Sequence, residues 1–385
     1  MESVRAVAAG VAALRDRWGD DVVAGEPVEL SGSGRSVVLR VPLSGRAASV
    51  IVKGYDPPAD SAGFDPLENE AVAGELFGTL PGPPVGPELL AADLSRRVLV
   101  FSDLGDHPAL SDVLLGSDPD AAEQGLLTWA RGLGQIAART RDPWPRVAQI
   151  QAELGISHRD NPIAGSIRVE LGEIVELAGA RYGIEARAGL DRDLAVATSL
   201  LDRSAYDIFS PADACPDNNQ LTPNGIRFFD FEFAGCCSLF RDAAYTVAPF
   251  PTCWCVLDMP VAMTNRVETA YRDEVLPTFP ELADDDIWYD GLIRASALYT
   301  IRRVGSMLRR PPGELDAGSF EEHGVFFPGA AVEVHFRLGR LLALDRGVIP
   351  SLMDFLRDID GRLVAEFGEA ALAMPAYPAF TGLPA

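Results

Sequence analysis

Hydrophobic positions divide the chain into two parts with different periodicities. Apolar side chains recur at helical spacing through residues 1–20, which predicts an amphipathic helix there. Short apolar runs then alternate with turns, and the run Pro81–Pro84 ends a segment of helical propensity. The first part is therefore predicted to contain strands at 28–30, 37–41, 48–53, 88–92 and 98–101, with a helix over 68–80.

The pattern changes after residue 105, where long Ala/Leu-rich helical segments dominate. One short β-like island interrupts them at 218–233, and no internal repeat or low-complexity linker is present. The helices are predicted at 121–138, 190–201, 287–308, 330–344 and 351–372. We therefore predict a two-lobed α+β fold, with a β-rich N-lobe over 1–104 and a mainly helical C-lobe over 105–385. The boundary near 104 is expected to be a hinge inside one unit.

The balance of charged residues narrows the class of partner. The chain has 33 basic and 56 acidic residues, a formal charge of −23. Such a surface repels phosphate backbones and anionic lipids, which predicts no nucleic-acid or membrane partner, whereas a cationic small molecule is attracted. A generally acidic soluble protein has the same balance, so the charge alone identifies no ligand. No apolar run approaches the ~18–20 residues that span a bilayer and no signal-peptide pattern is seen, so a cytoplasmic protein is expected.

Two residue types have unusual distributions. Lys53 is the single lysine, and the other 32 basic residues are arginine. GC-rich codon usage explains the bias, but the one retained lysine indicates a site that needs a compact ammonium group. The five cysteines are an odd number with C-C and C-W-C spacings, which fit neither a disulfide framework nor a zinc site. We therefore predict that they are buried, unpaired side chains. They are Cys215, Cys236, Cys237, Cys253 and Cys255.

Candidate nucleotide-binding residues lie in the N-terminal part. In the turn Ser31-Gly32-Ser33-Gly34, backbone N–H groups can approach phosphate oxygens because the two glycines carry no side chain, although a hairpin turn also needs glycine. Lys53 ends the strand V-I-V-K, where it is suited to bind phosphate. Glu70 on the following helix is predicted to hold Lys53 by an ion pair. Glu68 and Glu75 on the same helix are alternatives.

Candidate catalytic and metal-binding residues lie just before and within the β-like island. Asp213 and Asn218 are five residues apart, a spacing used in kinase catalytic loops, where the Asp accepts the substrate hydroxyl proton and the Asn binds Mg²⁺. An apolar-rich strand then leads into Asp230-Phe231-Glu232. Asp230 at the end of such a strand is placed to bind the Mg²⁺ of a nucleotide, because this cation prefers oxygen ligands.

These motifs resemble the aminoglycoside phosphotransferase/choline kinase superfamily, a small-molecule branch of the protein-kinase-like fold. The matching features are V-I-V-K at Lys53, V-L-V-F-S-D-L-G at 98–105, L-G-Q-I-A-A-R-T at 133–140, D-A-C-P-D-N at 213–218, F-F-D-F-E at 228–232 and R-D-A-A-Y at 241–245. The resemblance spans about residues 25–250; the C-terminal helices match only in general character.

The resemblance implies residue roles. It implies that ATP or GTP binds between the lobes and that its γ-phosphoryl passes to a hydroxyl of a small molecule. Asp213 would be the catalytic base, Asn218 and Asp230 the Mg²⁺ ligands, and Lys53 with Glu70 the phosphate-binding pair. The turn at 31–34 and the hinge-like residues Ser102, Asp103 and Leu104 would also contact the nucleotide. Asp242 falls where the superfamily has an Asp that braces the catalytic loop.

One departure from the superfamily pattern leaves the activity open. Pro211-Ala212-Asp213 stands where these kinases have His-Gly-Asp. The leading hypothesis is a kinase for an amino sugar, an aminoglycoside, another natural product or an amino alcohol, with the acceptor cationic or neutral. The first alternative is a pseudokinase that binds nucleotide without transfer. The second is a metal hydrolase that uses the carboxylates of Asp213, Asp217, Asp230 and Glu232, although no histidine accompanies them. The oligomeric state is not predicted.

Overall fold

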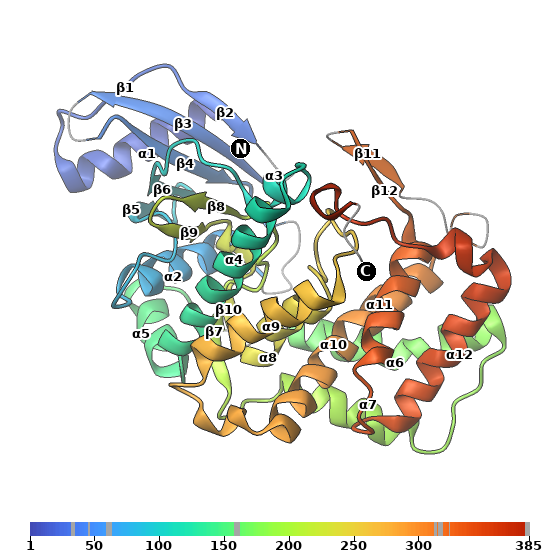
Figure 1. The fold of residues 1–385 in the computed structure, drawn as a ribbon. Coiled ribbons are helices and arrows are strands. Elements are labelled where there is room, and N and C mark those ends of the chain that lie inside the picture. The colour runs from blue at the N-terminus through green and yellow to red at the C-terminus, as the bar shows by residue number, and fades with distance from the viewer. Residues whose placement is uncertain are drawn as a thin grey trace.

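A computed structural model describes most of the chain. The residues it describes are 1–31, 35–44, 47–58, 64–157, 162–311, 314, 319–322 and 324–381. The fold is α+β with two lobes, as predicted: a sheet-containing region at the N-terminal end and a larger helical region (Figure 1). No helix within the described ranges is both long and apolar enough to cross a membrane.

The N-terminal region is one six-stranded antiparallel sheet with a helix on each face. Strand order is β1-β3-β4-β6-β5, and β2 also pairs with β3. The predicted helices and strands of this region are all present, within a few residues of the predicted ends. They are α1 (Ser3–Trp18), β1 (Val23–Ala24), β2 (Val28–Ser31), β3 (Ser36–Ser44), β4 (Ser49–Tyr55), α2 (Pro66–Gly78), β5 (Leu89–Asp93) and β6 (Val98–Ser102).

Side-chain alternation along β4 decides what each face of the sheet packs against. Val50 and Val52 join the core under α1, whereas Tyr55 joins the smaller cluster that includes Leu67 of α2. Because successive strand residues point to opposite faces, Lys53 lies on the α2 side with Tyr55. Gly54 lets α1 approach on the other side, since a Cβ there would lie 2.8 Å from the Cβ of Ala6.

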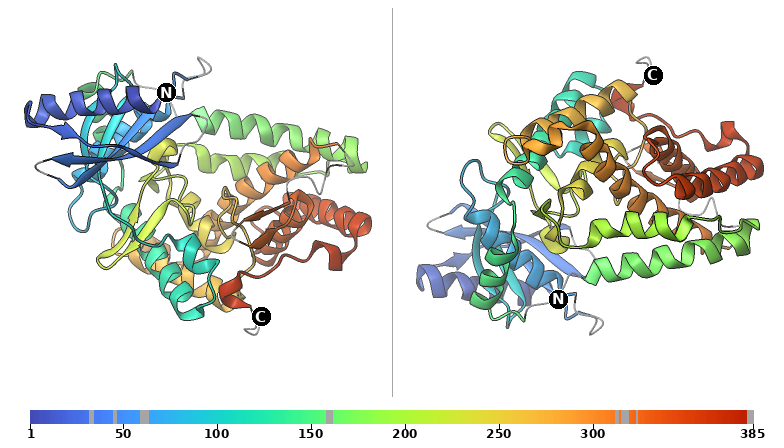
Figure 2. Two further views of the ribbon diagram at one scale, coloured as in Figure 1. Left: turned by 90° about the horizontal axis from the view of Figure 1, so that it is seen from above. Right: turned by 90° about the horizontal axis from the view of Figure 1, so that it is seen from below.

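The helical region has two hydrophobic cores. The first lies around α4, α8 and α9 and contains the fully buried Trp129 and Trp288. The second joins α6, α7, α10, α11 and α12 at the end of the molecule away from the sheet (Figure 2). The helices are α3 (Leu110–Leu114), α4 (Pro119–Arg139), α5 (Trp144–Glu153), α6 (Pro162–Tyr182), α7 (Leu190–Thr198), α8 (Leu239–Val247), α9 (Val261–Val275), α10 (Asp285–Leu308), α11 (Ala330–Ala343) and α12 (Pro350–Phe367).

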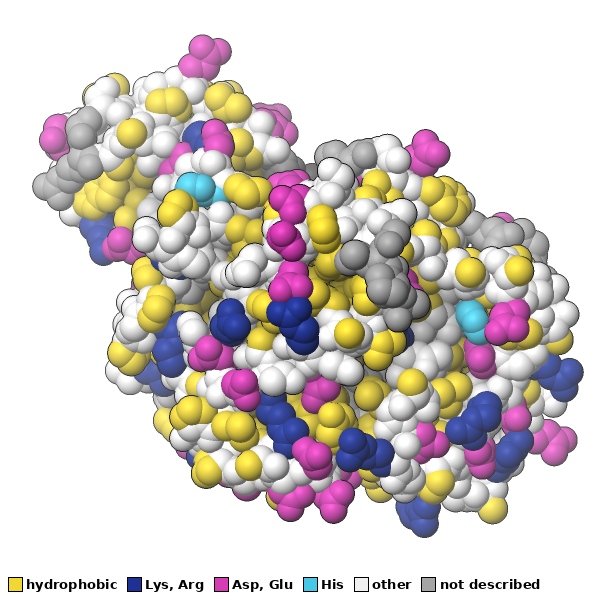
Figure 3. Space-filling model, viewed as in Figure 1, with side chains coloured by type: hydrophobic (Ala, Val, Ile, Leu, Met, Phe, Trp, Pro, Cys, Tyr) yellow, Lys and Arg dark blue, Asp and Glu magenta, His cyan; other side chains and the backbone are white. Residues whose placement is uncertain are grey.

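Three two-stranded antiparallel sheets, counted over the described residues, complete the helical region. They are β7 (Asp207–Ser210) with β10 (Gly235–Ser238), β8 (Asn219–Thr222) with β9 (Gly225–Phe228), and β11 (Phe320–Glu322) with β12 (Val325–Phe327). Asp213 lies between β7 and β8, and Asp230 lies between β9 and β10. The space-filling surface is hollowed between the N-terminal and helical regions, and acidic and hydrophobic side chains border this hollow (Figure 3).

Candidate active site

Lys53 lies at the centre of a buried charge network. Its side chain is 7% exposed, and its Nζ lies 2.7 Å from Oε2 of Glu70 and also contacts Oδ1 of Asp230. Burial lowers the pKa of Lys53, but the two carboxylates outweigh it and hold the pKa above its usual value, so Lys53 stays protonated. The predicted ion pair of Lys53 with Glu70 is therefore present. Of the alternatives on the same helix, Glu75 is exposed and Glu68 is half-buried.

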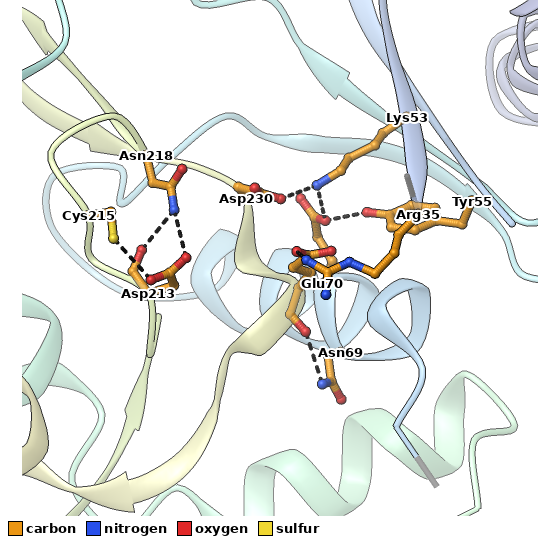
Figure 4. Close-up of polar contacts among 10 residues, drawn as sticks. Arg35, Lys53, Tyr55, Asn69, Glu70, Asp213, Cys215, Asn218 and Asp230 are labelled. Carbon is orange, nitrogen blue, oxygen red and sulfur yellow. Dashed lines mark hydrogen bonds and ion pairs between the residues drawn. The ribbon is translucent and has the colours of Figure 1, made fainter. Parts of the chain in front are cut away.

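Tyr55 is a member of this network that the sequence analysis missed. Its hydroxyl donates to Oε2 of Glu70, the oxygen that also pairs with Lys53. Tyr55 follows Lys53 by two residues on the same face of β4, so strand periodicity was a usable signal. The hydroxyl fixes the carboxylate of Glu70 for its contact with Lys53 (Figure 4).

Asp230 joins the two regions of the molecule. It follows β9, and its backbone has the left-handed conformation (φ 63°), which asparagine and aspartate tolerate better than most other residues. The 3₁₀ turn η2 (Phe231–Phe233) comes next and packs against α2, with Phe231 and Phe77 ring centroids 4.8 Å apart. This packing sets Asp230 beside Lys53, which comes from the sheet.

Asp213 lies in the loop between β7 and β8, and both of its carboxylate oxygens accept hydrogen bonds. Asn218 Nδ2 donates to Oδ2 of Asp213 (3.1 Å) and to its carbonyl oxygen (3.1 Å), while Thr252 Oγ1 donates to Oδ1 (2.7 Å). Burial raises the pKa of Asp213 and the nearby Asp217 and Asp230 raise it further, whereas the donors from Thr252 and Asn218 oppose the rise. The structure thus brings Asp213 and Asn218 together, as the five-residue spacing predicts.

A second aspartate braces this loop from α8. Asp242 is 1% exposed and accepts a hydrogen bond from Ser210 Oγ, which in turn accepts one from the backbone N–H of Ala212 (2.8 Å). Ala212 is left-handed (φ 61°) at the position where the superfamily pattern has glycine. The loop therefore holds a non-glycine residue in a conformation that costs about 1–2 kcal/mol.

The prediction that all five cysteines are unpaired is wrong. Cys215 and Cys253 form a disulfide, whereas Cys236, Cys237 and Cys255 are free. The bond ties the Asp213 loop to the segment after α8. An odd number of cysteines and their local spacing contain no information about a pair 38 residues apart. For the other three, the prediction holds in part: Cys236 and Cys255 are buried and Cys237 is half-buried.

The remaining predicted nucleotide contacts lie at the edge of the site. Gly32, Ser33 and Gly34 lie outside the described residues, and Ser31 ends β2. Arg35, on the far side of this turn, pairs with Glu232 (2.6 Å), which sequence reasoning did not anticipate.

In the hinge-like segment, the side chains are bound within the protein. Asp103 pairs with Arg40 (2.7 Å) and accepts from Ser49 Oγ (2.6 Å). Ser102 Oγ accepts from the backbone N–H of Glu88. The polar side chains of Ser102 and Asp103 are therefore already paired within the protein.

The oxygen donors between the two regions fit a hard divalent cation. The side-chain amide N–H of Asn218 donates to Asp213, which leaves the side-chain amide oxygen available as a metal ligand. The backbone N–H of Phe229 donates to the backbone carbonyl oxygen of Asn218 (3.1 Å). This contact places Asn218 next to Asp230. Oε2 of Glu232 is buried and has no hydrogen-bond partner among the described residues. Carboxylate and amide oxygens of this kind are the ligands Mg²⁺ prefers.

The chain thus has a kinase-like two-lobed fold in which a Lys–Glu–Asp network faces an Asp–Asn loop (Figure 4). A scan of protein-family models and a search of curated proteins find no match. Among solved structures, the chain is similar to Plasmodium vivax ethanolamine kinase, with 14% identity over 87% of this chain and 85% of the other and a TM-score of 0.46. It is also similar to a putative fructosamine-3-kinase from Thermobifida fusca, with 17% identity over 89% of this chain and 98% of the other and a TM-score of 0.45. A third similar structure is a type VIII aminoglycoside-3'-phosphotransferase, with 19% identity over 77% of this chain and 98% of the other and a TM-score of 0.41.

Proposed function

We propose that this chain is a small-molecule kinase that transfers the γ-phosphoryl group of ATP or GTP to a hydroxyl of an acceptor. The observation that supports this most is the contact of Lys53 with both Glu70 and Asp230. It joins a cation from the sheet to a carboxylate beside the Asp213 loop. Phosphoryl transfer depends mainly on such positioning and charge stabilisation.

Each residue has a role in this proposal. The nucleotide lies between residues 1–104 and 105–385, with its base at the backbone of 102–104 and its phosphates at Lys53 and the turn at 31–34. Asn218 and Asp230 hold Mg²⁺, which when bound neutralises charge on the phosphates. Asp213 accepts the proton of the acceptor hydroxyl while the hydroxyl oxygen bonds to the γ-phosphorus. The bond between the γ-phosphorus and the bridging oxygen of the β-phosphate breaks, and the nucleoside diphosphate leaves.

The acceptor is proposed to be a cationic or neutral alcohol, such as an amino sugar, an aminoglycoside, another natural product or an amino alcohol. Asp213, Asp217 and Glu232 lie around the site, and the whole chain carries a charge of −23. This field attracts an amine and opposes a carboxylate or a phosphate ester. Because salt screens the field, the KM of an amine acceptor is expected to rise with ionic strength.

The test is a mass-spectrometric screen for phosphorylated products with MgATP, MgGTP and a panel of amino alcohols, aminoglycosides and amino sugars. Asp213→Asn is expected to lower kcat by roughly 10²–10⁴-fold while calorimetric nucleotide affinity stays near that of the parent. Asp217→Asn is the matched control, since Asp217 shares the loop and accepts a hydrogen bond from Trp254 (2.6 Å). Asp217 belongs to the proposed acidic field and accepts no proton in the proposal, so its loss is expected to raise the KM of an amine acceptor and to leave kcat near that of the parent.

Two outcomes would change the proposal. Full kcat in Asp213→Asn would mean that another group accepts the proton. Binding of MgATP by the parent without transfer to any acceptor or to water would favour the pseudokinase alternative, for which the replacement of His-Gly by Pro211-Ala212 is the supporting observation.

A further inference from the structure

The segment that follows α8 crosses the loop of Asp213 and is anchored on both sides of Thr252. Phe250 is 1% exposed, with its ring centroid 5.3 Å from that of Trp129, and its carbonyl oxygen accepts from Arg337 (3.3 Å). Cys253 is tied to the Asp213 loop by the disulfide to Cys215. Thr252 therefore lies between a core anchor and a covalent anchor, which leaves its side chain little freedom to move away from Asp213.

The hydrogen bond from Thr252 to Asp213 has a forced direction. Thr252 Oγ1 lies 2.7 Å from Oδ1 of Asp213 and 2.7 Å from the hydroxyl of Tyr245. An ionised carboxylate only accepts, so the single hydroxyl proton of Thr252 goes to Asp213. The Tyr245 hydroxyl also donates to the carbonyl oxygen of Ala212 (2.8 Å), so its one proton is shared between this oxygen and Thr252 Oγ1. Tyr245 of α8 thus holds Thr252 beside the loop of Asp213.

We propose that Thr252 is the positioning residue of the catalytic carboxylate, an inference that rests on the proposed function. With Asn218 on Oδ2 and Thr252 on Oδ1, the carboxylate of Asp213 cannot rotate freely. Each oxygen still has a lone pair for the acceptor hydroxyl. Pro211-Ala212 supplies no side chain for this task, so the orienting contact comes from the segment after α8.

The disulfide also helps to position Asp213, because it fixes Cys253, the residue next to Thr252, to the loop of Asp213. A dithiol reductant transfers two electrons and two protons to the sulfurs of Cys215 and Cys253, which become thiols, and is itself oxidised to its disulfide. The Phe250 anchor remains after this step. Reduction is therefore expected to lower turnover in the same direction as loss of the Thr252 hydroxyl, and by a smaller factor.

The experiment measures ADP formation from MgATP, with water or any acceptor from the screen, in the full chain. Thr252→Val keeps the shape and removes the donor, and its kcat is expected to fall roughly ten- to a hundredfold, the size of effect that a misplaced reacting group produces. The KM and the calorimetric affinity for MgATP should stay within about twofold of the parent values, because neither Thr252 nor Asp213 contacts the nucleotide in the proposal. Thr252→Ser restores the hydroxyl and is expected to recover most of the kcat.

The outcomes separate this inference from the proposed function. If Asp213→Asn is inactive but Thr252→Val keeps the parent kcat, the positioning role is wrong and the proposed function stands. If Thr252→Val loses melting temperature and nucleotide affinity together with kcat, and Thr252→Ser does not recover them, the residue is only structural. Equal activity of Asp213→Asn and parent, or no ADP formation by the parent, would overturn both proposals.

A separate assay tests the role of the disulfide. Parent enzyme is assayed with and without dithiothreitol, with the thiol count checked by mass, and Cys253→Ser is the control in which the dithiol should change nothing. We expect reduced parent and Cys253→Ser to share a lowered kcat at unchanged nucleotide affinity. A fully reduced parent with the kcat of the oxidised form would show that Thr252 holds Asp213 without the disulfide.

Discussion

Replacing Asp242 by asparagine should change how stability depends on pH. Asp242 is almost wholly buried, Ser210 donates to one of its oxygens, and the other oxygen has no hydrogen-bond partner in the described part of the chain. Burial raises the pKa of this carboxyl to about 7, against the ordinary 3.8. Arg241 and the Ser210 hydroxyl lower it only in part.

The sign follows from proton binding. Between pH 4 and 7 the folded protein keeps the proton on Asp242 while the unfolded chain releases it, so the free energy of unfolding falls as pH rises through this window and is level above it. A pKa difference of about three pH units corresponds to about 4 kcal/mol. Asp242→Asn has no such titration. Its stability relative to the parent should therefore rise with pH.

Urea unfolding at several pH values tests this directly. The sequence pI is about 4.5, so a range of pH 5.5 to 8 keeps the protein charged and still covers about half of the change, about 2 kcal/mol. Subtracting the parent's free energy of unfolding from that of the variant at each pH removes the contribution of titrating groups that both proteins contain. Asp207→Asn is a control for loss of a buried aspartate, since Trp144 and Ser204 donate to its two oxygens. A flat or falling difference curve for Asp242→Asn would refute the reasoning.

Three further predictions concern the network and the loop. Lys53→Ala leaves Glu70 buried without its cation, so we expect a loss of about 3–5 kcal/mol in thermal or urea unfolding together with loss of MgATP turnover; an unchanged melting temperature would contradict the buried pair. Ala212→Gly should relieve the left-handed conformation and raise stability by about 0.5–1 kcal/mol, whereas a less stable variant would show that the alanine is not strained. Asp230→Asn should weaken calorimetric binding of MgATP by roughly tenfold or more and leave binding of metal-free ATP nearly unchanged. Equal loss with and without Mg²⁺ would remove Asp230 from the metal site.

Local periodicity was enough to predict the contacts that lie within or next to one element. Lys53 at the end of an apolar strand and Glu70 on the first helix after it form the expected ion pair. Asp213 and Asn218 share one loop, so a spacing of five residues already limits their separation. The strands of the N-terminal sheet were predictable for the same reason, because alternation and turns are readable over a few residues.

Contacts between distant segments were not predictable from the sequence. Thr252 lies in a stretch with no periodicity, and its approach to Asp213 depends on where α8 ends and how the chain turns back at Phe250. The disulfide from Cys215 to Cys253 has the same cause. Asp103 looked suited to a nucleotide contact, but Arg40 and Ser49, which come from other strands, bind its carboxylate.

The buried Lys53 makes this chain an unusual object for amine-directed chemistry. Because it is the single lysine, the only primary amines are the one at Lys53 and the one at the N-terminus, and the latter contacts Asp56. An acylating reagent that reaches the Lys53 amine must enter through the space where nucleotide phosphates are proposed to lie. Since Glu70 and Asp230 hold the pKa of this amine above its usual value and keep it protonated, it is a poor nucleophile. Acylation at Lys53, read from intact mass with no background from surface lysines, would then report opening of the buried charge network.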